Sequence, residues 1–230
     1  MYPGPAMNLP PPTSRLIQSR FVLFLGATLL LAAARFGDTT TLGLAVAILA
    51  TQSAFLCFAV AGATWHGQPA RPGLGMNPPR RPLNLSSAAS VIAGILLISF
   101  SLALLLEYSG LRENSALAEL ENRFAQTEPR HLPFLLVGVA LLPAFAEELL
   151  FRGFLLGALG RRFGNQTGLV ASSLLFALAH LDLAQGLAAF VLGLYLGGVR
   201  LRTGSVHASF LGHASNNAVA VLAPHFIPFG

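Results

Sequence analysis

Apolar residues fill most of the chain in long runs, separated by short polar stretches rich in Pro, Gly and Arg. A helix needs about 20 mostly apolar residues to cross a bilayer, and several runs approach or exceed that length. We interpret seven runs as spans, over residues 21–34, 41–64, 88–106, 132–159, 169–181, 183–199 and 206–222. The pattern predicts an all-α, polytopic transmembrane helical bundle of about seven spans. The count becomes eight if the long fourth run is split or if residues 111–128 add a span.

Residues 111–128 follow a different pattern. Leu117, Leu120 and Phe124 recur at spacings of three and four between charged residues. That spacing places the apolar side chains on one face of a helix. We expect an amphipathic helix that lies at the membrane interface or caps the bundle.

Two local signals concern the sixth run. Asp182 stands directly before it and is expected to cap the helix that follows. Gly193 and Gly197 form a GxxxG pattern, which favours close packing of this helix against a neighbour.

Composition supports a membrane protein. Of 230 residues, 54% are hydrophobic and 10% charged, whereas soluble domains average about 25% charged residues. The net charge of +5 comes from arginines scattered over short loops, which argues against nucleic-acid binding. The single Cys57 excludes a disulfide within the chain. The lipid bilayer is therefore the expected surrounding.

The arginines also predict orientation and organisation. Most of them fall on alternate loops, as Arg15/Arg20, Arg71/Arg80/Arg81, Arg161/Arg162 and Arg200/Arg202. The positive-inside rule therefore places the N-terminus in the cytoplasm of a multi-pass protein, which we expect in a bacterial plasma membrane. Arg15 and Arg20 before the first run resemble a signal peptide, although a retained span is favoured. The expected segments are a disordered Pro-rich tail (1–14), N-terminal spans (15–130) with a cytoplasmic loop (66–85), a C-terminal core of spans (131–222) and a C-terminal tail (223–230).

Three charged residues interrupt the fourth run, at Glu147, Glu148 and Arg152. Placing a charge at this depth of a membrane costs free energy unless the charge is paired, hydrated or required for function. Glu148 and Arg152 are four residues apart, so they share a helix face and should form an ion pair. Glu147 points roughly 100° away and has no partner on its own helix. Pro143, one turn earlier, should kink the helix.

Polar residues in later runs are candidates to meet Glu147. His180 ends the fifth run, and His213 and Asn217 share a face of the seventh. Helical rise places Glu147, His180 and His213 at depths of roughly 21, 20 and 13 Å, which permits a common site. A carboxylate and an imidazole can deprotonate a water, and the other two groups can donate hydrogen bonds to an oxyanion. The set therefore suits hydrolysis.

Three motifs in this order resemble those of the CPBP family. They are Glu147-Glu148-xxx-Arg152, Phe176-xxx-His180 and His213-xxx-Asn217. The family includes the type II CAAX prenyl endopeptidases and bacterial relatives linked to abortive infection and bacteriocin self-protection. The resemblance implies an intramembrane, glutamate-dependent endopeptidase. It implies catalytic roles for Glu147, His180, His213 and Asn217, and support roles for Glu148 and Arg152.

Alternatives remain open at this point. The protein could be a non-enzymatic membrane scaffold or a bacteriocin-immunity factor, or a proton-coupled transporter. We expect no cofactor, although Glu147, His180 and His213 would also make a zinc ligand set. The expected substrate is a protein or peptide, and the resemblance to the family implies that it could be prenylated or membrane-anchored. Oligomeric state is not predicted.

Overall fold

The computed structural model describes residues 22–23, 25–27, 30, 41–65, 69–113 and 115–226. The expected tail 1–14, most of the expected first span and the last four residues lie outside the described residues. Helices account for every regular element of the described part, which contains no strand. The helices that precede residue 129 are α2 (Thr41–Thr64), α3 (Ala70–Gly73), α4 (Leu85–Tyr108) and α5 (Ala116–Ala125).

A long helical segment then runs from Pro129 to Phe163 and changes its winding along its length. Its parts are η1 (Pro129–His131), α6 (Leu132–Leu135), η2 (Leu136–Leu141), α7 (Leu142–Glu147), η3 (Glu148–Leu155) and α8 (Leu156–Phe163). Three further helices follow in the described part of the chain, namely α9 (Asn165–Leu178), α10 (Leu183–Thr203) and α11 (Val206–Phe226).

Four helices of the described part are long and apolar enough to cross a membrane. They are Ala45–Thr64, Leu85–Tyr108, Pro129–Phe163 and Leu183–Thr203. The all-helical membrane class is therefore confirmed, whereas the count of seven or eight spans stays a prediction. The helix at the expected fifth span, α9, has 14 residues, which is shorter than a full crossing needs.

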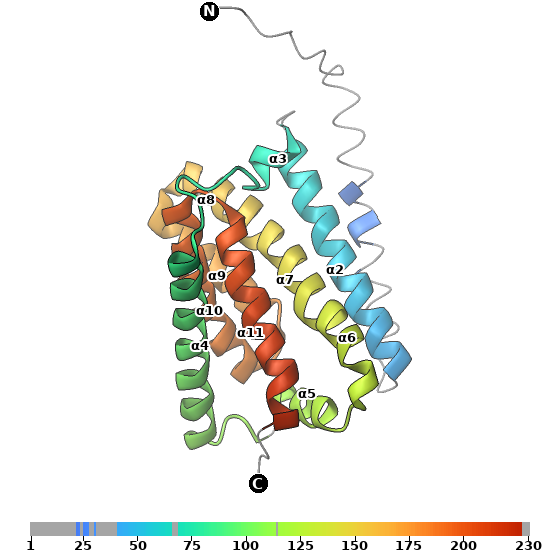
Figure 1. Ribbon diagram of the computed structural model, residues 1–230. Helices are drawn as coiled ribbons and strands as arrows, with labels where there is room; N and C mark the ends of the chain where they lie inside the picture. Colours follow the sequence, from blue (N-terminus) through green and yellow to red (C-terminus); the bar gives the residue numbers. More distant parts are fainter. Residues whose placement is uncertain are drawn as a thin grey trace, which may run out of the picture.

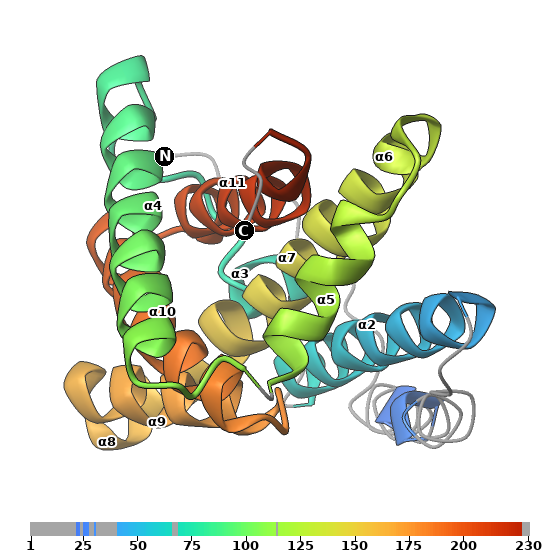
Figure 2. The same cartoon turned by 90° about the horizontal axis from the view of Figure 1, so that it is seen from below.

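The long helical segment lies at the centre of the bundle (Figure 1). Its middle, α7 and η3, contacts α2 on one side and α9, α10 and α11 on the others. Seen from below, α4 and α2 flank the molecule at opposite sides (Figure 2). The buried apolar core includes Leu149 and Phe151 of η3 together with Phe176 of α9. The arrangement surrounds the charged stretch of η3 with apolar packing.

Two parts of the central segment, η2 and η3, are π-helical. In a regular α-helix the ring of Pro143 would crowd the carbonyl of Val139 four residues earlier. Val139 lies inside η2, so the break expected at Pro143 takes the form of a π segment just before it. The second π segment begins at Glu148. Such insertions are rare and often occur at functional sites.

The expected amphipathic helix is present but shorter, as α5. Its Phe124 is buried, and the helix covers the end of the bundle beside the end of α11 (Figure 1). Asp182 caps α10 as expected, because its Oδ1 accepts a hydrogen bond from the backbone of Gln185 at 2.8 Å. Its Oδ2 also accepts from the backbone of Ala116 at 3.1 Å, which ties α5 to the start of α10.

At the opposite end of the bundle, the segment after α3 lies directly on η3. A Cβ on Gly153 would lie 2.3 Å from the backbone oxygen of Leu74. The segment is held there by the bond from the backbone of Val206 to that of Gly75, at 3.0 Å. The GxxxG face packs closely as expected, since a Cβ on Gly193 would lie 3.0 Å from the side chain of Ser173 of α9.

Candidate active site

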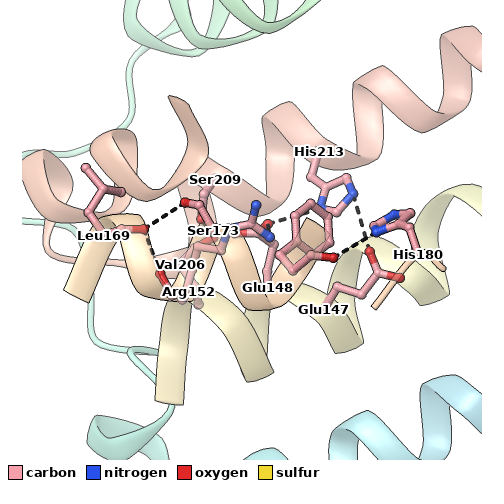
Figure 3. A network of polar contacts seen from close by, with 11 residues as sticks. Glu147, Glu148, Arg152, Leu169, Ser173, His180, Val206, Ser209 and His213 are labelled. Carbon is pink, nitrogen blue, oxygen red and sulfur yellow. Dashed lines mark hydrogen bonds and ion pairs between the residues drawn. The ribbon is translucent and has the colours of Figure 1, made fainter. Parts of the chain in front are cut away.

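The charged stretch of the central segment meets α9 and α11 in the middle of the bundle. Glu147 is the last residue of α7 and Glu148 the first of η3, so the two carboxylates leave the helix where its winding changes. His213 comes from α11, and His180 follows the last turn of α9. Their side chains gather in one polar network (Figure 3).

Glu148 and Arg152 form the ion pair expected from their spacing. The distance from Arg152 Nη1 to Glu148 Oε1 is 2.8 Å, and both side chains are at most 2% exposed. His213 Nδ1 lies 3.0 Å from the same carboxylate oxygen. Because a carboxylate only accepts, His213 Nδ1 carries the proton in this contact. Glu148 therefore holds the His213 ring as well as the arginine, a link that the sequence did not reveal.

Glu147 is contacted from two other helices. Its Oε2 lies 3.6 Å from His213 Nε2, and its side chain is 12% exposed. Its Oε1 accepts a hydrogen bond from Gln52 Nε2 of α2 at 3.1 Å. Sequence reasoning missed Gln52. The available signal was an amide in the middle of the apolar run 41–64, of the same kind as the charges that drew attention to the fourth run.

His180 is oriented by its own helix. Its Nδ1 lies 2.8 Å from the backbone oxygen of Phe176, one turn earlier. A carbonyl only accepts, so Nδ1 is the protonated nitrogen, and Nε2 of the neutral ring keeps a lone pair. The ring points toward Glu147 (Figure 3), although no direct hydrogen bond joins the two described side chains. The FxxxH spacing is thus explained, because the backbone of Phe176 sets the tautomer of His180.

The ring of Phe176 also separates the polar groups. It packs edge-on against His180 at 4.8 Å and against His213 at 5.8 Å between ring centroids. Its face lies 4.2 Å from the guanidinium carbon of Arg152. A buried aromatic ring in contact with a cation and two imidazoles limits the rotation of all three.

Asn217 lies one turn after His213 on α11 and is half-buried. Its side chain makes no hydrogen bond within the described part of the chain. The structure therefore brings Glu147, His180 and His213 together, and the Asn217 amide, on the same helix face as His213, has no hydrogen-bond partner among the described residues.

A metal centre is not preformed at this site. Among residues 41–65, 69–113 and 115–226, no three His, Cys, Asp or Glu side chains are arranged to hold a metal ion. His213 Nδ1 contacts Glu148 and His180 Nδ1 contacts a backbone carbonyl, and His213 Nε2 lies near the Glu147 carboxylate. The arrangement is a carboxylate with two oriented imidazoles, which can bind and deprotonate a water.

Comparison with known proteins agrees with the motifs. Residues 129–219 match the family model described as "Type II CAAX prenyl endopeptidase Rce1-like". Neither the curated proteins nor the solved structures contain a match to the chain. The matched region includes all three motifs, with Glu147, Glu148, Arg152, His180, His213 and Asn217, whereas Gln52 lies outside it. Over residues 129–219, which hold all three motifs, the chain is therefore similar to the Rce1-like type II CAAX prenyl endopeptidases.

Proposed function

We propose that the protein is an intramembrane, CAAX-protease-like endopeptidase that uses a glutamate-activated water. One observation carries the proposal, namely that the carboxylate of Glu147 lies 3.6 Å from His213 Nε2 and that the His180 ring points toward it. A distance of 3.6 Å is too long for a direct hydrogen bond, so Glu147 Oε2 keeps its capacity to accept one from a water. The substrate is a protein or peptide, with a prenylated or membrane-anchored one as the first class to test.

In this mechanism Glu147 and His180 bind the attacking water. Glu147 takes its proton as the oxygen attacks the scissile carbonyl, so a C–O bond forms and the carbonyl oxygen becomes negative. The side chains of His213 and Asn217 donate hydrogen bonds to that oxygen. Donation from His213 Nε2 requires a ring protonated on both nitrogens. The proton held by Glu147 then passes to the leaving amine as the C–N bond breaks.

The surrounding residues orient these groups. Glu148 accepts a hydrogen bond from His213 Nδ1, and the carbonyl of Phe176 holds His180 Nδ1. The first contact turns His213 Nε2 toward Glu147, 3.6 Å from its Oε2, and the second fixes the orientation of the His180 ring. Fixing the tautomer and the orientation of a functional imidazole through its second nitrogen is a general device of active sites.

The test is a cleavage assay with purified protein in detergent. A panel of quenched fluorescent peptides, with and without a farnesylated C-terminal CAAX sequence, is incubated with the wild type and with the Glu147→Gln and His180→Ala variants. We expect each variant to lose roughly 10²- to 10⁴-fold in kcat, the usual contribution of a general base. Full activity of Glu147→Gln would exclude the mechanism.

Two matched controls separate chemistry from general damage. Glu128→Gln and His131→Ala change the same residue types at exposed positions of the chain, and both should keep wild-type activity. A parallel arm with a chelator tests metal dependence, and we expect no loss of cleavage. If Glu147→Gln instead leaves the biological phenotype intact while Arg152→Ala abolishes folding, the motifs have a structural role in a non-enzymatic membrane scaffold.

A further inference from the structure

Gln52 is a buried amide within the long, mostly apolar helix α2. Its side chain reaches Glu147 across the interface between α2 and α7, and the residue is 6% exposed. Helix α2 lies outside residues 129–219, the region that matches the family model. The contact therefore adds a helix to the site that the motifs do not include.

The carboxylate determines which end of the amide faces it. Gln52 Nε2 donates to Glu147 Oε1 at 3.1 Å, whereas the reversed amide would place two acceptor oxygens against each other. In this orientation Gln52 Oε1 is buried and has no hydrogen-bond partner within the described part of the chain. A buried carbonyl without a partner lowers stability.

Stability alone therefore does not account for an amide at this position. A methionine has a similar length and would fill the same space without leaving a polar atom unsatisfied. The amide does something else, because it occupies one oxygen of Glu147 and leaves the other, Oε2, facing His213.

We propose that Gln52 is a positioning residue for Glu147, and this inference rests on the proposed function. By binding Oε1 it fixes the rotation of the carboxylate, so that Oε2 is the oxygen that receives the proton of the attacking water. A general base must lie within hydrogen-bond reach of the proton that it removes, so the orientation of the carboxylate affects the rate directly.

The decisive variant is Gln52→Met, assayed on a peptide that the wild type cleaves. We expect kcat to fall roughly ten- to hundredfold, the value of a hydrogen bond to a charged group expressed as a rate. KM should stay within about twofold, since a buried amide does not touch the substrate. The Tm should stay within about 3 °C of the wild type, because losing the bond to Glu147 is offset by removing the unsatisfied carbonyl.

Thr51→Val is the matched control. Thr51 is the half-buried neighbour of Gln52 on α2, and its substitution should change neither kcat nor Tm appreciably. An unchanged kcat in Gln52→Met would overturn the inference while the proposed function stands. A fall in kcat that merely follows a large fall in Tm would also overturn it, because it would show a structural role.

A second measurement does not depend on proteolysis. Infrared difference spectra between the wild type and Glu147→Gln isolate the carboxylate band of Glu147, and the same band is then recorded in Gln52→Met. We expect the carboxylate band of Glu147 to shift when the amide donor of Gln52 is removed. A band at the same frequency would overturn it even if no peptide were cleaved, whereas a shifted band without any cleavage would count against the proposed function alone.

Discussion

Arg152 shows how strongly one residue can depend on its partner. Its guanidinium is 2% exposed and is paired with Glu148 inside the bundle. Arg152→Met removes the cation and leaves the buried Glu148 carboxylate without its arginine partner, held only by the contact with His213. Breaking a buried pair in this way typically destabilises a protein by about 3–5 kcal/mol. We expect a large fall in Tm, measured by thermal unfolding in detergent.

The matched control is Arg130→Met. Arg130 pairs with Glu128 at 2.8 Å, but both side chains are more than half exposed. Exposed ion pairs contribute about 0–1 kcal/mol, so this variant should unfold close to the wild-type temperature. Equal stability losses in the two arginine variants would contradict the assignment of Arg152 to a buried, compensated charge.

At the scale of elements, the position of η3 depends on a close approach by another segment. A Cβ added to Gly153 of η3 would lie only 2.3 Å from the backbone oxygen of Leu74. A backbone atom cannot move aside as the end of a side chain can. Gly153→Ala should therefore displace η3 or the 74–84 segment and destabilise the fold by about 1–3 kcal/mol, the usual cost of overpacking.

Gly138→Ala provides the comparison within the same long helical segment. Gly138 lies in η2, and apart from the nearby backbone of its own helix no described atom comes within 4 Å of the place where its Cβ would be. Alanine favours helix over glycine, so this variant should match or exceed wild-type stability by up to about 1 kcal/mol. Thermal unfolding of both variants checks the prediction, and equal effects would show that the contact with Leu74 is absent.

At the scale of the whole molecule, the two ends of the bundle are chemically different. One end carries the 74–84 segment and the turn at Gly204, next to Arg80 and Arg200, and the other carries α5 (Figure 1). The arginine distribution predicts that the first end faces the cytoplasm. Arg81 and Glu128 are exposed positions at opposite ends.

Labelling single cysteines from either side of the membrane checks this orientation. In a Cys57→Ala background, Arg81→Cys should react with an impermeant thiol reagent only from the cytoplasmic side. Glu128→Cys should react only from the outside. Labelling of both positions from one side would contradict the arrangement, and the reversed pattern would contradict the orientation.

Features that depend only on residues close together in the sequence were predictable. The ion pair of Glu148 and Arg152 needs only helical spacing, and the cap at Asp182 needs only the residue type before a helix. The amphipathic helix followed from its apolar period, although its ends were placed too far apart. The membrane class followed from composition, since so little polar surface leaves no other way to cover the chain.

Contacts between distant helices were not predictable, because they depend on how the helices rotate and pack. Gln52 and Glu147 are 95 residues apart, and Glu148 and His213 are 65 apart. The π winding of η3 was equally hidden, since residue type does not set it. The sequence by itself determined a helical membrane protein with a charged stretch and a set of candidate polar residues. Only the tertiary structure decided that Glu148 holds His213 and that Gln52 holds Glu147, because helix packing alone sets which polar groups meet inside a bundle.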